Sequence, residues 1–297
     1  MRLLLLRVPG YLFAVLALVL IAAPASPTQP LAVSAFEEFV SKRYAKTNPA
    51  WNFQQFCPVL TSLVAERVMR EYGSMFAAGE SITLPDVCIF GGEAETLRYQ
   101  KKLITESLEI DGVPITLQSA AAQALRKSID EAAQKQLRIT PYDGAIAGSR
   151  TYGDTLRLWN GRFFSAMDHW TRRGRLTEAD RESVSRLDLH RRIEKIINWE
   201  AQGIWFSTDR TRSIFSSVAP PGSSQHLAFI AFDVVEYGDP DVRTILNRNG
   251  WYQTVAGDPV HFTFLEVPET ELPGRGLRAV VKGGHFYWIP NLSPPMH

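Results

Sequence analysis

Apolar residues in the first two thirds of the chain recur at the three- and four-residue spacing of amphipathic helices. From Phe36 to about Tyr99 the pattern is mostly helical, and one apolar face carries Leu60, Leu63, Val64, Val68 and Tyr72. A second helix is predicted from Leu117 to Leu137, where alanines are frequent and favour helix. A third is predicted from Asp154 to Arg173, followed by Gly174 at a position that suits a helix end.

After Gly203 the apolar pattern becomes that of extended chain. Strands are predicted at residues 204–207, 227–235, 260–267 and 277–281, and Lys282-Gly283-Gly284 joins the last of these to a strand at 285–289 as a hairpin. Helices first and strands later indicate an α+β fold: a small antiparallel sheet packed with helices, preceded by a helical N-terminal region.

Composition adds limits on size and partners. The chain has 297 residues, of which 45% are hydrophobic and 21% charged, and its formal net charge is +1. This balance is that of a globular protein with room for one large or two smaller domains. We expect an N-terminal helical subdomain over residues 26–110 and a second domain over 111–297. A charge near zero argues against nucleic acid as a partner.

The N-terminus has the features of a signal peptide over residues 1–25. Arg2 and Arg7 precede the apolar run Tyr11–Ala23, and Ala23-Pro24-Ala25 supplies small residues for cleavage before Ser26. The run is about thirteen residues long, whereas a membrane-spanning helix needs about twenty. We therefore expect an exported protein, periplasmic or secreted, without a membrane anchor after cleavage. Residues 26–35 are rich in Pro, Ala and Ser and are predicted to be a linker.

The chain contains two cysteines, Cys57 and Cys88. In an oxidising compartment such a pair favours a disulfide, here closing a loop of about thirty residues. Two free buried thiols are the alternative, because sequence gives no distance between them.

Candidate metal ligands occur in two segments of the strand-rich part. Asp233 follows the apolar run Leu227–Phe232, and a carboxylate in a buried strand is costly unless a cation compensates it. His226 lies just upstream, and His261 lies in the strand after Asp258. Two histidines and one carboxylate are a recurrent ligand set for catalytic zinc, and a further carboxylate suits a general base.

These segments resemble a known family. Ser224, His226, Ala231 and Asp233 are similar to the Ser-x-His-x-x-Gly-x-Ala-x-Asp motif of the VanY-type D-alanyl-D-alanine carboxypeptidases, which are zinc peptidases of bacterial peptidoglycan. Asp258 and His261 resemble the second motif of that family, and Asp-Pro-Val-His-Phe is close to its phage L-alanyl-D-glutamate endopeptidases. Gly250-Trp251 and Ser149-Arg150-Thr151 also resemble family segments, so the similarity runs from about Leu117 to Leu265.

The resemblance implies a role for each of these residues. His226, Asp233 and His261 would bind Zn²⁺, Asp258 would be the general base, and Arg150 and Ser224 would bind the substrate, a peptidoglycan stem peptide. Residues 111–297 would then be a zinc peptidase domain, with D-alanyl-D-alanine carboxypeptidase as the expected activity.

Two departures from the family keep alternatives open. Phe229 stands where the motif has Gly, and a bulky ring in the groove would suit a non-catalytic peptidoglycan-binding protein on the same scaffold. A helical insertion of about fifty residues separates Arg150 from the strands, which leaves Arg210 and Arg212 as competitors for its role. An L,D-endopeptidase and a peptidase for other peptides are further alternatives.

Overall fold

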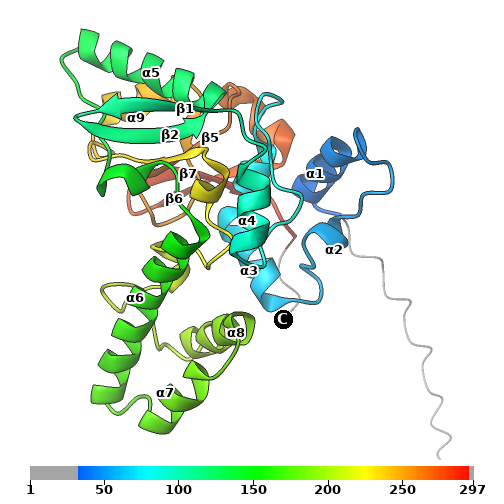
Figure 1. Cartoon of the computed structure of the whole chain (residues 1–297), viewed down its shortest axis with the longest axis vertical. Helices are drawn as coiled ribbons and strands as arrows, with labels where there is room; N and C mark the ends of the chain where they lie inside the picture. The colour runs from blue at the N-terminus through cyan, green and yellow to red at the C-terminus, as the bar shows by residue number, and fades with distance from the viewer. Residues whose placement is uncertain (1–32, 294–297) are drawn as a thin grey trace, which may run out of the picture. The chain divides into compact units, whose positions relative to one another are not determined.

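The structure is a computed structural model that describes residues 33–293. The predicted signal peptide and most of the predicted linker lie outside the described residues. The fold is α+β, as expected, with small antiparallel sheets (Figure 1). No helix among residues 33–293 is long and apolar enough to cross a membrane.

The first described elements are helices α1 (Ala35–Ala45), α2 (Phe53–Phe56), α3 (Leu63–Tyr72) and α4 (Glu93–Gln100), with the 3₁₀ helix η1 (Gly73–Ala77). Ser34, in the predicted linker, caps α1 together with Glu37, because each side chain accepts a hydrogen bond from the other residue's backbone N–H. A disulfide joins Cys57 to Cys88, whose Cα atoms are 5.4 Å apart. This bond ties the segment between α2 and α3 to the loop before α4.

A hairpin occupies the region where the predicted second helix was to begin. Strand β1 (Thr105–Ile110) pairs antiparallel with β2 (Val113–Gln118) across Asp111 and Gly112, which both have positive φ. Asp-Gly is a strong signal for such a two-residue turn. Helix α5 (Ser119–Gln134) therefore starts after Leu117, which is buried in the strand instead. The predicted domain boundary at residue 110 falls in this turn, and the division stays a prediction.

Helices α6 (Tyr152–Arg172), α7 (Glu178–Ser185) and α8 (Leu189–Glu200) form the insertion, here called the α6–α8 arm. Capping boxes begin α6 and α7, and Gly174 follows α6 with a φ of +67°, as predicted. Figure 1 shows the three helices packed against one another, away from the strands. The arm and α3 share one hydrophobic core. Its buried side chains include Val68, Tyr72, Trp159, Phe163, Ile196, Phe206 and Phe215.

The strand-rich part is divided more finely than predicted. Its central sheet has the order β3-β5-β4, from β3 (Ala231–Asp233), β4 (Trp251–Gln253) and β5 (His261–Phe264). The predicted strand at 227–235 is shorter because Gln225–Ala228 forms the 3₁₀ helix η4, and residues 204–207 form no strand. Short apolar runs in a core do not show their period, so this error is expected. The predicted last hairpin is confirmed as a separate sheet of β6 (Leu277–Lys282) and β7 (His285–Pro290).

The remaining elements connect these sheets. They are η2 (Gly144–Ala147), η3 (Ile214–Ser216), α9 (Pro240–Arg248), η5 (Glu269–Glu271) and η6 (Pro273–Arg275). Figure 1 shows α5 beside the β1–β2 hairpin, and α9 packs on α5 and β4. A second, larger hydrophobic core joins these helices to the central sheet, with Leu125, Phe232, Ile245 and Phe262 among its fully buried side chains. Two of the predicted metal ligands, Asp233 and His261, lie in the central sheet where β3 ends and β5 begins.

Candidate metal centre

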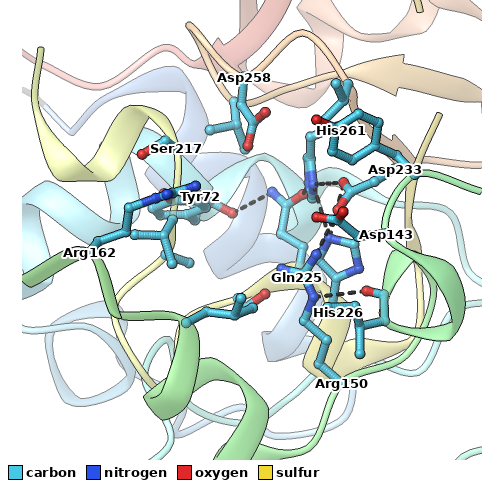
Figure 2. Close-up of a pocket in the computed structure, with 18 of the residues that line it drawn as sticks. Tyr72, Asp143, Arg150, Arg162, Ser217, Gln225, His226, Asp233, Asp258 and His261 are labelled. Carbon is cyan, nitrogen blue, oxygen red and sulfur yellow. Dashed lines mark hydrogen bonds and ion pairs between the residues drawn. The ribbon is translucent and has the colours of Figure 1, made fainter. Parts of the chain in front are cut away.

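Three predicted ligands meet where β3 ends and β5 begins. Asp233 and His261 are register partners in the antiparallel pair, and His226 lies in η4 immediately before β3. All three side chains are buried, and they can hold a metal ion as a group. His226 Nε2 is 3.2 Å from His261 Nδ1, and Asp233 Oδ1 is 3.3 Å from the former and 3.0 Å from the latter (Figure 2).

A backbone carbonyl determines the tautomer of His226. Its Nδ1 lies 2.6 Å from the carbonyl oxygen of Gly148, which can only accept a hydrogen bond, so Nδ1 carries the proton. Burial, followed by the charge of Arg150, lowers the pKa of His226 to about 4. The ring is therefore neutral near pH 7, and its Nε2 presents a lone pair to the other two ligands.

Gln225 determines the tautomer of His261. The amide nitrogen of Gln225 donates to the backbone carbonyl of Tyr72 at 2.8 Å, which turns its Oε1 toward His261 Nε2, also at 2.8 Å. Because an amide oxygen only accepts, His261 Nε2 carries the proton and Nδ1 faces the metal centre with a lone pair. The same oxygen accepts from Thr263, whose hydroxyl lies 2.7 Å from that of Thr254. This network is buried, with Gln225 fully inaccessible to solvent.

Asp233 is held as a charged carboxylate. Its Oδ2 accepts from Arg150 Nη2 at 2.6 Å, which leaves Oδ1 directed at the two histidines. Burial acts to raise the pKa of Asp233, but the charges of His226, which is protonated at low pH, and of Arg150 outweigh it and hold that pKa well below its usual range. The backbone N–H of Tyr142 donates to the Asp233 carbonyl at 2.9 Å and fixes the end of β3.

This arrangement fits a divalent cation better than a proton. Three acceptor atoms converge, and a proton on one of them can satisfy only one of the three contacts. Ligands at the Zn–N distance of about 2.0–2.1 Å on a tetrahedral ion lie about 3.3 Å from one another. The observed separations of 3.0–3.3 Å match that spacing. The donor set of two imidazoles and one carboxylate is the one expected for catalytic zinc.

The centre opens into a pocket of about 530 Å³ that also contains Asp258, Arg150 and Ser224. Asp258 lies in the turn before β5, and burial, with the charge of Asp233 second, raises its pKa to about 7. A carboxyl that titrates near neutral pH suits a general base or acid. Ser224 is buried at the start of η4, on the pocket wall.

Of the three arginines considered from the sequence, Arg150 is the one at the metal centre. Its Nε donates to the carbonyl of Ile146 at 2.9 Å, and its Nη2 binds Asp233. Arg210 donates to the hydroxyl of Ser165, and Arg212 to the carbonyl of Gly257. Neither of these two lines the pocket. Arg150 is therefore engaged with a ligand, a contact that the sequence did not indicate.

Phe229 replaces the glycine of the motif that this segment resembles, and it does not block the site. Its φ of +56° is in the left-handed region, which glycine adopts at the least cost and which explains a glycine at this position in the motif. Phe229 is not among the residues that line the pocket. The ring therefore does not fill the groove beside the ligands.

Three groups that shape this centre were not predicted from the sequence: the Gly148 carbonyl, the Tyr72 carbonyl and the side chain of Gln225. Backbone carbonyls carry no side-chain signal in a sequence. Gln225 did carry a signal in the sequence. It is a polar amide beside His226 in a segment that leads into a buried strand, and a buried amide requires hydrogen-bond partners. Comparisons with known protein families, with curated proteins and with solved structures found no match to this chain.

Proposed function

We propose that the protein is an exported zinc peptidase that hydrolyses peptidoglycan stem peptides, with D-alanyl-D-alanine carboxypeptidase as its activity. The observation that carries this proposal is the convergence of the ligand atoms of His226, Asp233 and His261 beside Asp258 in one pocket. The peptidoglycan substrate rests on the resemblance of the two motifs, and export rests on the N-terminal sequence.

Each residue has a chemical task in this proposal. His226, Asp233 and His261 would hold the metal, and zinc at that position would polarise the scissile carbonyl and lower the pKa of a water molecule. Asp258 takes a proton from the attacking water as its oxygen bonds to the carbonyl carbon. Asp258 then gives that proton to the amine nitrogen as the C–N bond breaks.

Arg150 has two tasks in the proposal. Its ion pair with Asp233 keeps that ligand charged and oriented. At the pocket wall, the same guanidinium supplies positive charge for the oxygen that becomes negative in the transition state.

A non-catalytic peptidoglycan-binding protein is the second candidate, and the reason for considering it is the bulky side chain of Phe229. Phe229 does not line the pocket, so its ring gives no reason to favour a binding protein over an enzyme. All three ligands and the carboxylate of Asp258 are present together, which favours catalysis. An L,D-endopeptidase would use the same groups and differ only in how the pocket accommodates the peptide.

Digestion of purified muropeptides tests the proposal. We expect the mature, zinc-loaded protein to release terminal D-alanine, identified by mass spectrometry, and to lose this activity when zinc is removed. Release of a D-glutamate-containing fragment would indicate the endopeptidase. Binding of muropeptides by the zinc-loaded protein without any cleavage would establish the binding protein instead.

A further inference from the structure

The pocket has a second wall that belongs to the α6–α8 arm. Arg157, Leu158, Gly161 and Arg162 of α6 line it, together with Ser217 from the segment after the arm. Figure 2 shows Arg162 and Ser217 on one side of the pocket, and the metal ligands on the other. A peptide bound at the metal centre therefore has helix α6 beside it.

Arg162 is the uncommitted cation on this wall. Among residues 33–293, no acceptor receives a hydrogen bond from its guanidinium and no carboxylate lies within ion-pair distance of it. Arg157, one turn earlier, pairs with Asp154, and Arg150 is bound to Asp233 and Ile146. Of the three arginines that line the pocket, Arg162 alone has its planar set of donors free for a ligand.

The surroundings of Arg162 favour an anion. The side chain is half-buried, so part of its hydration is lost without a compensating partner. Arg210 lies near enough to add a second positive charge to this part of the arm, and its own pKa is lowered by burial and by Arg162. Asp258 lies close enough to Arg162 for an electrostatic interaction but forms no ion pair with it. The positive charge is therefore not neutralised within the pocket.

We propose that Arg162 binds the C-terminal carboxylate of the peptide substrate and so restricts the site to peptides that end just beyond the scissile bond. This inference rests on the proposed function, because it takes the metal centre as the place where the bond is cut. A guanidinium fits a carboxylate with two parallel hydrogen bonds, which an amide or a continuing chain does not reproduce. The α6–α8 arm thereby determines which end of a peptide enters the pocket.

Two peptides that differ only at the C-terminus test the proposal. One ends in D-alanyl-D-alanine with a free carboxylate, and the other carries a C-terminal carboxamide. We expect the wild-type protein to prefer the carboxylate, and Arg162→Gln to lower kcat/KM for that peptide by about 10- to 100-fold. The same substitution should change kcat/KM for the carboxamide little, so the preference collapses. Arg162→Lys should retain part of it, since lysine keeps the charge but not the planar fork.

Arg172→Gln is the matched control, because Arg172 is an exposed arginine of the same helix outside the pocket lining. It removes the same charge and should leave the preference unchanged. Zinc content and thermal unfolding of each variant establish that it is folded. An equal loss on both peptides in Arg162→Gln would show that Arg162 acts on Asp258 or on the fold, and would overturn the proposal.

Binding separates this proposal from the proposed function. Calorimetry measures the affinity of the two peptides for the zinc-loaded Asp258→Ala protein, in which turnover is suppressed. A carboxylate preference that Arg162→Gln abolishes supports the subsite even if the wild-type protein cleaves neither peptide. Equal affinities for the two peptides overturn the subsite, even if the wild-type protein is an active peptidase.

Discussion

Replacing Gln225 by Leu tests whether the buried network behind His261 controls metal binding. The substitution removes the acceptor of His261 Nε2 and of Thr263, and it removes the donor to the Tyr72 carbonyl. His261 can then place its proton on Nδ1, the atom that faces Asp233 and His226. The metal has to displace that proton before it binds.

The expected magnitude follows from the number of partners lost. Each buried polar group left without a partner costs about 1–3 kcal/mol, so the metal-free protein should unfold more easily. Loss of the group that orients a ligand typically lowers metal affinity by about 10- to 100-fold, which corresponds to about 1.4–2.7 kcal/mol. Gln225→Glu keeps an acceptor at the same place, so its zinc affinity should remain within about a few-fold of the wild type.

Competition with a chromophoric chelator measures zinc affinity in the three proteins, and thermal unfolding with and without zinc gives their stability. Thr96→Val is a control for stability alone, because the buried hydroxyl of Thr96, in α4, donates to the carbonyl of Gly92 just before that helix. It should destabilise the protein without changing zinc affinity. If Gln225→Leu binds zinc as tightly as the wild type, the role of the hydrogen bond is refuted. Equal losses of zinc affinity in Gln225→Leu and Gln225→Glu would refute it as well.

Four further outcomes are expected. The mature protein should contain about one zinc per chain, and elemental analysis of His261→Ala should find little; full occupancy in that variant would remove the proposed site. Asp258→Ala should keep its zinc while turnover of muropeptides falls by about 10²–10⁴-fold, and Asp258→Glu should retain part of the activity; unchanged turnover in the Ala variant would mean that the base is another residue. Thiol titration of the denatured, unreduced protein should find no free thiol, and replacing both Cys57 and Cys88 by Ala should lower the free energy of unfolding by about 3–4 kcal/mol in denaturant titrations, as expected for a loop of 31 residues. Burial raises the pKa of the Glu200 carboxyl in the folded protein, so the folded state favours its protonated form. The free energy of unfolding therefore falls as pH rises from the pKa of Glu200 in the unfolded chain through its higher pKa in the folded protein. Glu200→Gln should therefore stabilise the protein at neutral pH with a gain that shrinks toward pH 4, as measured by thermal unfolding across that range, and a gain independent of pH would contradict this reasoning.

The order and spacing of residues along the chain were sufficient to identify the three residues that can hold a metal ion and several element ends. Asp233 is a carboxylate at the end of an apolar run, and such a group must meet a cation wherever the strand is buried. The end of α6 before Gly174 is a local property of a few consecutive residues. Local chemistry of this kind is readable from sequence because it does not depend on what packs against it.

Contacts between distant segments decided the rest. The tautomer of His226 depends on a carbonyl 78 residues away in sequence, and the Gln225 side chain that orients His261 is itself fixed by a carbonyl 153 residues away. The position of Arg162 opposite the ligands depends on how the α6–α8 arm packs on α3, and no pattern within the arm encodes that position. The short strands of the central sheet were also misjudged, because complete burial hides the alternation of apolar and polar residues that marks a strand. Hydrogen bonds to backbone atoms and packing between segments far apart in the chain exist only once the chain has folded.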